Sequence, residues 1–411
     1  MNTKVRNRLQ DNGLAKGICA IFLVTILGWL TIRLASQLDL PPDDFVEYWA
    51  AGRLQLTGGN PYSPEQLFAL QKSVGWTDDI PIMMWNPPWT LPFVMPFGLF
   101  DYPIGRGLWF LLNLALMLLC IDSLWHFYGG PKPYRWLARI VSFLFLPTLV
   151  VLYLGQIGIL ILAGIVGFLH FERGQKWWLV GIVTVLIAIK PHLLYLFWIA
   201  LLLWAIDQRR WSVVISGSLF GLVATAIPML PNPSVIAQYL HALNNDTPLR
   251  WHTPTIGMLL RLLFGEEKHW LQFLPAALGA LWFLFYWQQH RRTWHWAKQM
   301  PLLLLMSACT RPFGWTLDLV VLLPAVIQVT VWLLGSRHRW LIGLATISYL
   351  AISVLAAAPI LPTGDFWRLW MAPALLLTYL VLWKQIGRET LTLPRVPPFE
   401  SQSQTTGNPT V

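Results

Sequence analysis

Charge is scarce in this sequence. Only 12% of its 411 residues are charged, whereas 56% are hydrophobic and the mean hydropathy is +0.54. Because soluble domains carry about 25% charged residues, this chain has too little polar surface to stay in water as a globular domain. The scarcity excludes a soluble protein and predicts an all-α, polytopic membrane protein.

Cysteine and internal repetition are also lacking. Cys19, Cys120 and Cys309 all lie in apolar runs, without the spacing of metal ligands or of a disulfide framework. No segment recurs at a fixed offset, although paired repeats are typical of secondary transporters. This absence favours an enzyme, with a multi-pass transporter or lipid flippase as the alternative.

Long apolar runs are what the sequence has in abundance. A further run at about 82–100 contains Pro87, Pro88, Pro92 and Pro96, which remove backbone hydrogen bonds, so we expect it to pack against protein or to be re-entrant. The alternative is that it crosses the bilayer and that another short helix does not. About twelve other runs are candidate spans. They lie at roughly 17–36, 105–126, 136–153, 156–171, 177–190, 193–207, 211–230, 270–288, 300–311, 315–334, 340–359 and 366–385.

The basic residues set the expected orientation. If 82–100 does not cross, most of the 29 lysines and arginines fall on one face, which the positive-inside rule makes cytoplasmic. The net charge of +10 is then explained by attraction to anionic lipid and not by binding of nucleic acid.

We expect one domain, 1–388, in a bacterial plasma membrane with both termini cytoplasmic, and a polar, disordered tail at 389–411. The opposite face receives two long loops, at about 38–104 and 231–269.

The first long loop carries helix signals. Asp43 or Asp44 can cap a helix that runs to about Thr57 and is stopped by Gly58-Gly59. Its large apolar residues share one face, which predicts a helix lying in the membrane interface. Ser63, Pro64 and Gln66 have the pattern that opens a second short helix.

An ordered set of short segments resembles glycosyltransferase family 87. The segments are Asp44–Arg53 with Leu56–Tyr62, Asn86–Pro88, Leu108-Trp109 with Asn113–Leu116, Gly155-Gln156 with Leu160–Leu162, Lys190–His192, Thr255–Gly257 with Arg261-Leu262, and Trp315 with Asp318–Val320. They cover about residues 40 to 330. The chain departs from the pattern at Trp315-Thr316-Leu317-Asp318, where many members carry Trp-x-His-His.

The resemblance implies a GT-C fold and a polyprenyl-phosphate sugar donor, often a mannose donor. It implies transfer with inversion to a lipid or glycan acceptor on the extracytoplasmic face, usually without a metal, so no cofactor is expected. Together with its place at the start of the first loop, the resemblance makes Asp44 the candidate general base. The alternative, purely structural role of Asp44 is that of a helix cap, and Asp43 is the alternative candidate for the base.

Cations near helix ends are the candidate ligands of the donor phosphate, because charge builds on the leaving group. They are Lys190, His192, Arg311 and Arg261. Lysine at membrane depth is costly and usually faces a polar cavity, although Lys190 could instead snorkel to the interface.

Four further polar residues are candidate contacts to sugar or acceptor. They are Asp43, Glu47, Gln156 and Asp318. For Asp318 we favour a structural ion pair with Arg311. For Gln156 the alternative, purely structural role is helix capping.

Overall fold

The protein is helical wherever its structure is described. The computed structural model describes residues 42–245, 251–336, 338–358 and 364–387, and within these ranges all regular elements are helices. The predicted all-α class is therefore confirmed for this part of the chain. The predicted span 17–36 and the predicted tail 389–411 lie outside the described residues.

The α-helices follow one another with short connections. In chain order they are α2 (Phe45–Leu56), α3 (Pro64–Ser73), α4 (Leu91–Gly98), α5 (Tyr102–Phe127), α6 (Arg135–Leu144), α7 (Leu146–Tyr153), α8 (Gly158–Arg173), α9 (Trp177–Ile187), α10 (Tyr195–Asp207), α11 (Trp211–Met229), α12 (Val235–Asn245), α13 (Ile256–Phe264), α14 (Leu274–His290), α15 (Trp296–Thr310), α16 (Leu323–Gly335), α17 (Arg339–Ala357) and α18 (Met371–Leu382). Among the short 3₁₀ helices, η3 (Pro191–Leu194) precedes α10, η7 (Thr316–Leu322) precedes α16, and η8 (Phe366–Trp370) precedes α18.

Several helices are long and apolar enough to cross a membrane. Five qualify on length and composition among the described residues, or up to seven if each of two bent helix pairs forms one span. One pair, α6 with α7, bends by 67° where Pro147 begins the second helix. The other, α9 with η3–α10, turns by 120° at Lys190-Pro191. The described helices are consistent with a polytopic membrane protein, whereas the number of twelve spans stays a prediction.

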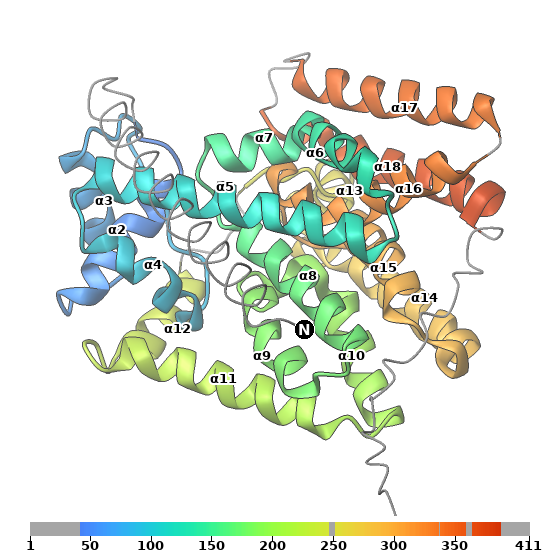
Figure 1. Ribbon diagram of the computed structural model, residues 1–411. Coiled ribbons are helices and arrows are strands. Elements are labelled where there is room, and N and C mark those ends of the chain that lie inside the picture. The colour runs from blue at the N-terminus through green and yellow to red at the C-terminus, as the bar shows by residue number, and fades with distance from the viewer. Residues whose placement is uncertain (1–41, 246–250, 337, 359–363, 388–411) are drawn as a thin grey trace, which may run out of the picture.

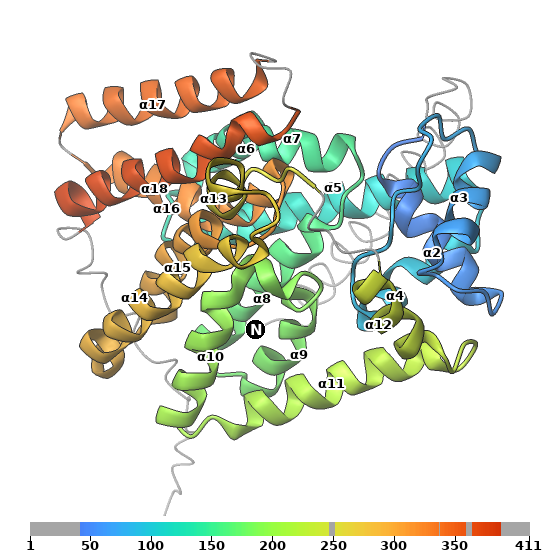
Figure 2. The same cartoon turned by 180° about the vertical axis from the view of Figure 1, so that it is seen from behind.

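The first loop forms a packed lobe at one end of α5. Figures 1 and 2 show α2, α3 and α4 gathered at the Tyr102 end of that helix, with α12 on the same side. The eight residues of α4 rise only about 12 Å, which is too short to cross a bilayer. The proline-rich run at 82–100 packs against α2, as predicted.

Glycines allow α2 and α4 to cross closely. A Cβ atom at Gly52 would lie 2.8 Å from the Val94 carbonyl oxygen, and one at Gly98 would lie 2.5 Å from the Arg53 nitrogen. Hydrogen in place of a side chain lets the two backbones touch, so the lobe is held by backbone packing as well as by side chains.

One expectation for α2 is wrong. The helix has the predicted bounds, but ten of its 12 residues are buried, so it has no single apolar face of the kind that lies on a membrane surface. Neighbouring helices α3, α4 and α5 cover its remaining sides. The predicted start of α3 is confirmed, because Ser63 Oγ accepts a hydrogen bond of 3.2 Å from the Gln66 nitrogen.

Candidate active site

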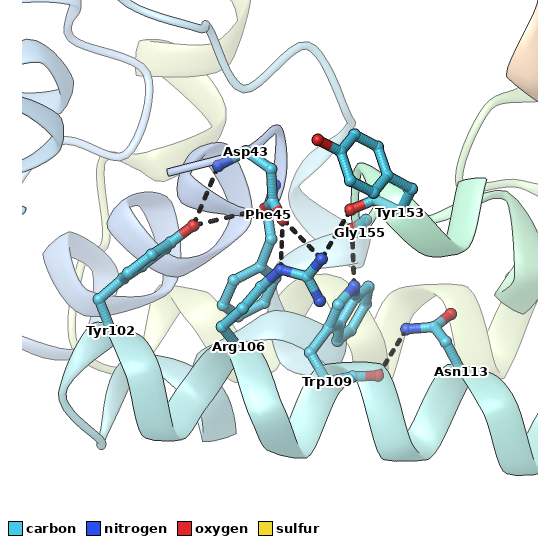
Figure 3. A network of polar contacts seen from close by, with 8 residues as sticks. All are labelled: Asp43, Phe45, Tyr102, Arg106, Trp109, Asn113, Tyr153 and Gly155. Carbon is cyan, nitrogen blue, oxygen red and sulfur yellow. Dashed lines mark hydrogen bonds and ion pairs between the residues drawn. The ribbon is translucent and has the colours of Figure 1, made fainter. Parts of the chain in front are cut away.

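Asp43 is an anchor of the fold. Its Oδ2 atom lies 2.5 Å from Nε of Arg106, and its Oδ1 atom accepts a hydrogen bond of 3.1 Å from the nitrogen of Phe45. Tyr102 contributes a further contact from α5, and Arg106 also donates to the Tyr153 carbonyl (Figure 3). Asp43 therefore caps α2 and ties it to α5, which leaves its carboxylate with little capacity for a substrate.

Asp44 has a different environment. Its side chain makes no capping hydrogen bond to α2, and Oδ2 accepts a 3.0 Å hydrogen bond from Nε2 of Gln156. The other end of Gln156, Oε1, accepts 2.7 Å from the Tyr48 hydroxyl. Burial raises the pKa of the Asp44 carboxyl, while the Gln156 hydrogen bond and the charge of Lys190 oppose that rise. A carboxylate of raised pKa is a stronger base, as proton abstraction requires.

The backbone around Gly155 brings Gln156 to Asp44. Gly155 has φ +68°, and a Cβ atom there would lie 2.8 Å from Cβ of Phe45. The nitrogen of Phe45 donates to the Leu154 carbonyl at 3.1 Å. Glycine is needed at this turn because both the conformation and the close approach exclude a side chain.

Lys190 lies at the break between α9 and η3. Its Nζ atom forms an ion pair of 3.0 Å with Oδ1 of Asp318, and Oδ2 of Asp318 accepts 2.8 Å from the nitrogen of Trp315. The expected ion pair between Asp318 and Arg311 is wrong, since Lys190 takes that place. Lys190 also acts electrostatically on Asp44 and Glu47 and so links the α2 lobe to the η7 segment.

The break at Lys190 is held by the proline-rich run. Nδ2 of Asn86 donates to the Ile189 carbonyl at 3.2 Å, and Nε1 of Trp89 donates to the Ala188 carbonyl at 2.9 Å. These carbonyls lie at the end of α9, where the helix offers them no partner. Side chains from the first loop therefore satisfy the helix end that presents Lys190.

Arg311 is a buried cation. It is 2% exposed, and its Nη2 atom donates to the Trp315 carbonyl at 2.9 Å. Within the described residues no carboxylate lies within ion-pair distance of it, and its Nε atom has no hydrogen-bond partner. Gly314 makes room for the guanidinium, because a Cβ atom there would lie 2.4 Å from its central carbon. Arg311 thus has unused capacity to bind an anion.

His192 and Arg261 differ in their distance from this centre. The partly buried His192 lies within electrostatic reach of Asp318, Lys190 and Arg311. Arg261 donates to the Glu266 carbonyl and to Oε1 of Gln272, so it braces the second loop. Gln272 in turn donates to the Pro312 carbonyl, which connects that loop to the Arg311 segment.

Comparison with known proteins identifies the family. The sequence model of glycosyltransferase family 87 matches residues 85–310, more than half of the chain. The chain belongs to glycosyltransferase family 87. Curated proteins and solved structures give no significant match.

The family 87 match covers only part of the candidate site. Gln156, Lys190, His192 and Arg261 lie inside the matched range. The remaining candidates flank it and are placed by geometry alone: Asp43, Asp44 and Glu47 before it, and Arg311 and Asp318 after it.

Sequence reasoning missed several residues that build this candidate site. Arg106, the partner of Asp43, stands out only as a lone charge near the start of an apolar run. Asp365 accepts 2.8 Å from the nitrogen of Thr316 and pairs with Arg368 at 2.9 Å, so it supports the start of η7 from a distant loop. No local pattern marks such long-range contacts.

An apolar cavity runs beside α16. Its volume is about 370 Å³, and it is bounded by α6, α16, α17 and α18. The part of its lining that η7 and α16 contribute runs from Leu322, about one turn after Asp318, to Leu334. A hydrophobic space therefore begins close to the polar site.

Metal ligands do not gather in the part of the chain that is described. No three His, Cys, Asp or Glu side chains there are placed to hold a metal ion together.

Proposed function

We propose that this family 87 protein transfers a sugar, mannose in the first instance, from a polyprenyl-phosphate donor to a lipid or glycan acceptor. The reaction inverts the anomeric carbon and takes place on the extracytoplasmic face of a bacterial plasma membrane. The observation that carries the proposal is a partly buried carboxylate, Asp44, within electrostatic reach of Lys190, whose partner Asp318 also lies within reach of the buried Arg311.

Asp44 is the proposed general base. The acceptor hydroxyl attacks the anomeric carbon and passes its proton to the Asp44 carboxylate, while the bond between that carbon and the phosphate oxygen breaks. Gln156 orients the carboxylate, and Tyr48 orients Gln156. A single displacement of this kind inverts the configuration.

Arg311 and Lys190 are the proposed ligands of the departing phosphate. Arg311 is buried and lacks a carboxylate partner among the described residues, so its charge is available to an anion. Lys190 forms an ion pair with Asp318 and also acts electrostatically on Asp44, and Asp318 in turn acts on Arg311. These two side chains would offset the growing negative charge without a metal. His192 is the proposed third contact, and Arg261 acts through the loop that it braces.

The donor lipid is proposed to use the cavity beside α16. The cavity lining is mostly apolar, and one of its residues, Leu322, lies about one turn from Asp318. A polyprenyl chain lying there would leave its phosphate near Lys190.

Charge distribution supports the orientation. Arg173, at the end of α8, donates to the Phe127 carbonyl, and Arg135 and Arg139 pair with Asp122, so these cations lie at the Phe127 end of α5. Asp43 and Arg106 lie near the Tyr102 end, with the candidate site. The positive-inside rule supports a cytoplasmic Phe127 end of α5 and an extracytoplasmic site, and we propose cytoplasmic termini on that basis.

The test is sugar transfer by the purified protein in proteoliposomes supplied with labelled polyprenyl-phosphate mannose and a membrane lipid extract as acceptor. We expect a product whose anomeric configuration is opposite to that of the donor. Asp44→Asn should abolish transfer, whereas Asp101→Asn, at a carboxylate that is 84% exposed, should not. Full activity of Asp44→Asn would eliminate Asp44 as the base, and counterflow of a labelled solute would support a transporter instead.

A further inference from the structure

Glu47 is a buried carboxyl that the fold does not use. It lies on α2 one turn after Asp44 and is 5% exposed. Across the described ranges its side chain has no hydrogen-bond or ion-pair partner, although buried polar groups normally have one. An acidic side chain kept in such a place, with nothing in the fold to bind, is available to a ligand.

The surroundings of Glu47, and burial above all, favour its neutral form. Lys190 attracts the ionised carboxylate of Glu47, whereas Asp44 and Asp318 repel it, and Tyr48 is a further titratable neighbour. Lys190 is already paired with Asp318 at 3.0 Å. Burial is the largest influence and raises the pKa of Glu47 well above its ordinary value. Lys190 and Arg311 set two positive charges against the three carboxyls of Asp44, Glu47 and Asp318, so it is favourable for one carboxyl to keep its proton.

A neutral carboxylic acid offers a combination that an ionised carboxylate lacks. Its hydroxyl donates one hydrogen bond and its carbonyl oxygen accepts another. A sugar hydroxyl needs both kinds of partner, because it donates and accepts as well. A phosphate needs donors or positive charge, and Lys190 and Arg311 already supply these.

We propose that Glu47 in its carboxylic acid form binds a hydroxyl group of the transferred sugar, and that Asp44 alone acts as the base. This inference rests on the proposed function and gives different roles to Asp44 and Glu47, which lie one helical turn apart. Glu47 recognises the sugar, Asp44 takes the acceptor proton, and the cations hold the phosphate.

The first experiment compares two variants of similar size. Glu47→Gln keeps a donor and an acceptor but cannot ionise, whereas Glu47→Leu fills the space without hydrogen bonds. We expect Glu47→Gln to stay within about threefold of the unmodified protein, and Glu47→Leu to bind the donor about tenfold to a hundredfold less tightly. Glu65→Gln, at an exposed position of the first loop, is the matched control.

The second experiment asks what Glu47 contacts. Binding of a polyprenyl-phosphate sugar and of the same polyprenyl phosphate without its sugar is measured for each variant in detergent. Glu47→Leu should weaken only the sugar-bearing lipid. Equal weakening of both lipids would overturn the inference, because it would indicate damage to the fold or a contact to phosphate.

Rates across pH separate this inference from the proposed function. As pH rises through the raised pKa of Glu47, transfer by the unmodified protein should fall, and Glu47→Gln should lose that alkaline decline. Glu47→Gln as inactive as Asp44→Asn, with unchanged melting temperature, would show that Glu47 acts as a carboxylate and would overturn the inference alone. An unmodified protein that transfers no sugar would overturn the proposed function, and this inference with it.

Discussion

Asp43 and Asp44 are neighbours in sequence at the start of α2, but their side chains face different regions of the molecule. Asp43 contacts Arg106, Tyr102 and the start of α2, so the fold occupies its oxygens. Asp44 receives one described hydrogen bond, from a neutral amide, and faces Lys190. Both carboxyls are partly buried and both have a raised pKa, so burial does not separate them. What separates an anchor from a reactive group here is how much hydrogen-bonding capacity the fold leaves open.

The largest effect should come from exchanging the two aspartates in turn for asparagine. Asp44→Asn should lower kcat by about 10²- to 10⁴-fold, the usual contribution of a general base, with an unchanged melting temperature. Asp43→Asn should instead lower stability by about 1–3 kcal/mol, because Arg106 loses its charged partner. Transfer assays and thermal unfolding of both proteins check this, and a reversed pattern would reverse the two roles.

A second contrast lies between Lys190 and Asp318. Lys190→Met should destabilise the protein by about 3–5 kcal/mol, since it leaves the buried carboxylate of Asp318 without its partner. Adding Asp318→Asn should recover much of that stability but not the activity. Urea unfolding of the single and double variants measures the coupling, and additive losses would mean that the pair is not formed.

Arg311 should behave differently from Lys190, because in the described structure it has no carboxylate to leave behind. Arg311→Gln should lower kcat by about 10²- to 10³-fold, as loss of a charge-stabilising donor does, with less change in stability than Lys190→Met. Single-turnover rates together with melting temperatures test this. A larger loss of stability than of rate would place Arg311 among the anchors.

The smallest effect concerns Gln156. Its hydrogen bond favours the charged form of Asp44, so Gln156→Leu should raise the pKa of that carboxyl further. The base must be ionised to act, so activity is lost as pH falls through this pKa. The acid limb of the rate profile should therefore move to higher pH by about one unit. An acid limb that does not move would separate Gln156 from the base.

Much of the fold could be predicted because apolar runs and caps are local. The run predicted at 211–230 is α11, and the helix expected from Asp43 or Asp44 to about Thr57 is α2. Bends were less predictable. The run at 136–153 divides at Phe145, where Pro147 starts a new helix in another direction.

The site was predictable in its residue types but not in its pairings. Charged residues in apolar surroundings, such as Lys190 and Asp318, are conspicuous in a sequence with so little charge. Which of them meet depends on the depth and rotation of each helix, so the partner of Asp318 was assigned wrongly to Arg311. Asp43 and Asp44 could not be ranked from sequence, because Arg106 stands 63 positions from Asp43.

The tether between the proline-rich run and α9 has a consequence for how this protein can be altered. Ala188 and Ile189 directly follow α9, where a carbonyl group without a hydrogen bond is costly in an apolar environment, and Asn86 and Trp89 donate to their carbonyls. The helix break that presents Lys190 therefore depends on two distant stretches of the chain. Replacing either the proline-rich run or the end of α9 alone with the sequence of a relative should remove these hydrogen bonds and change the position of Lys190. The two stretches should therefore be exchanged only together.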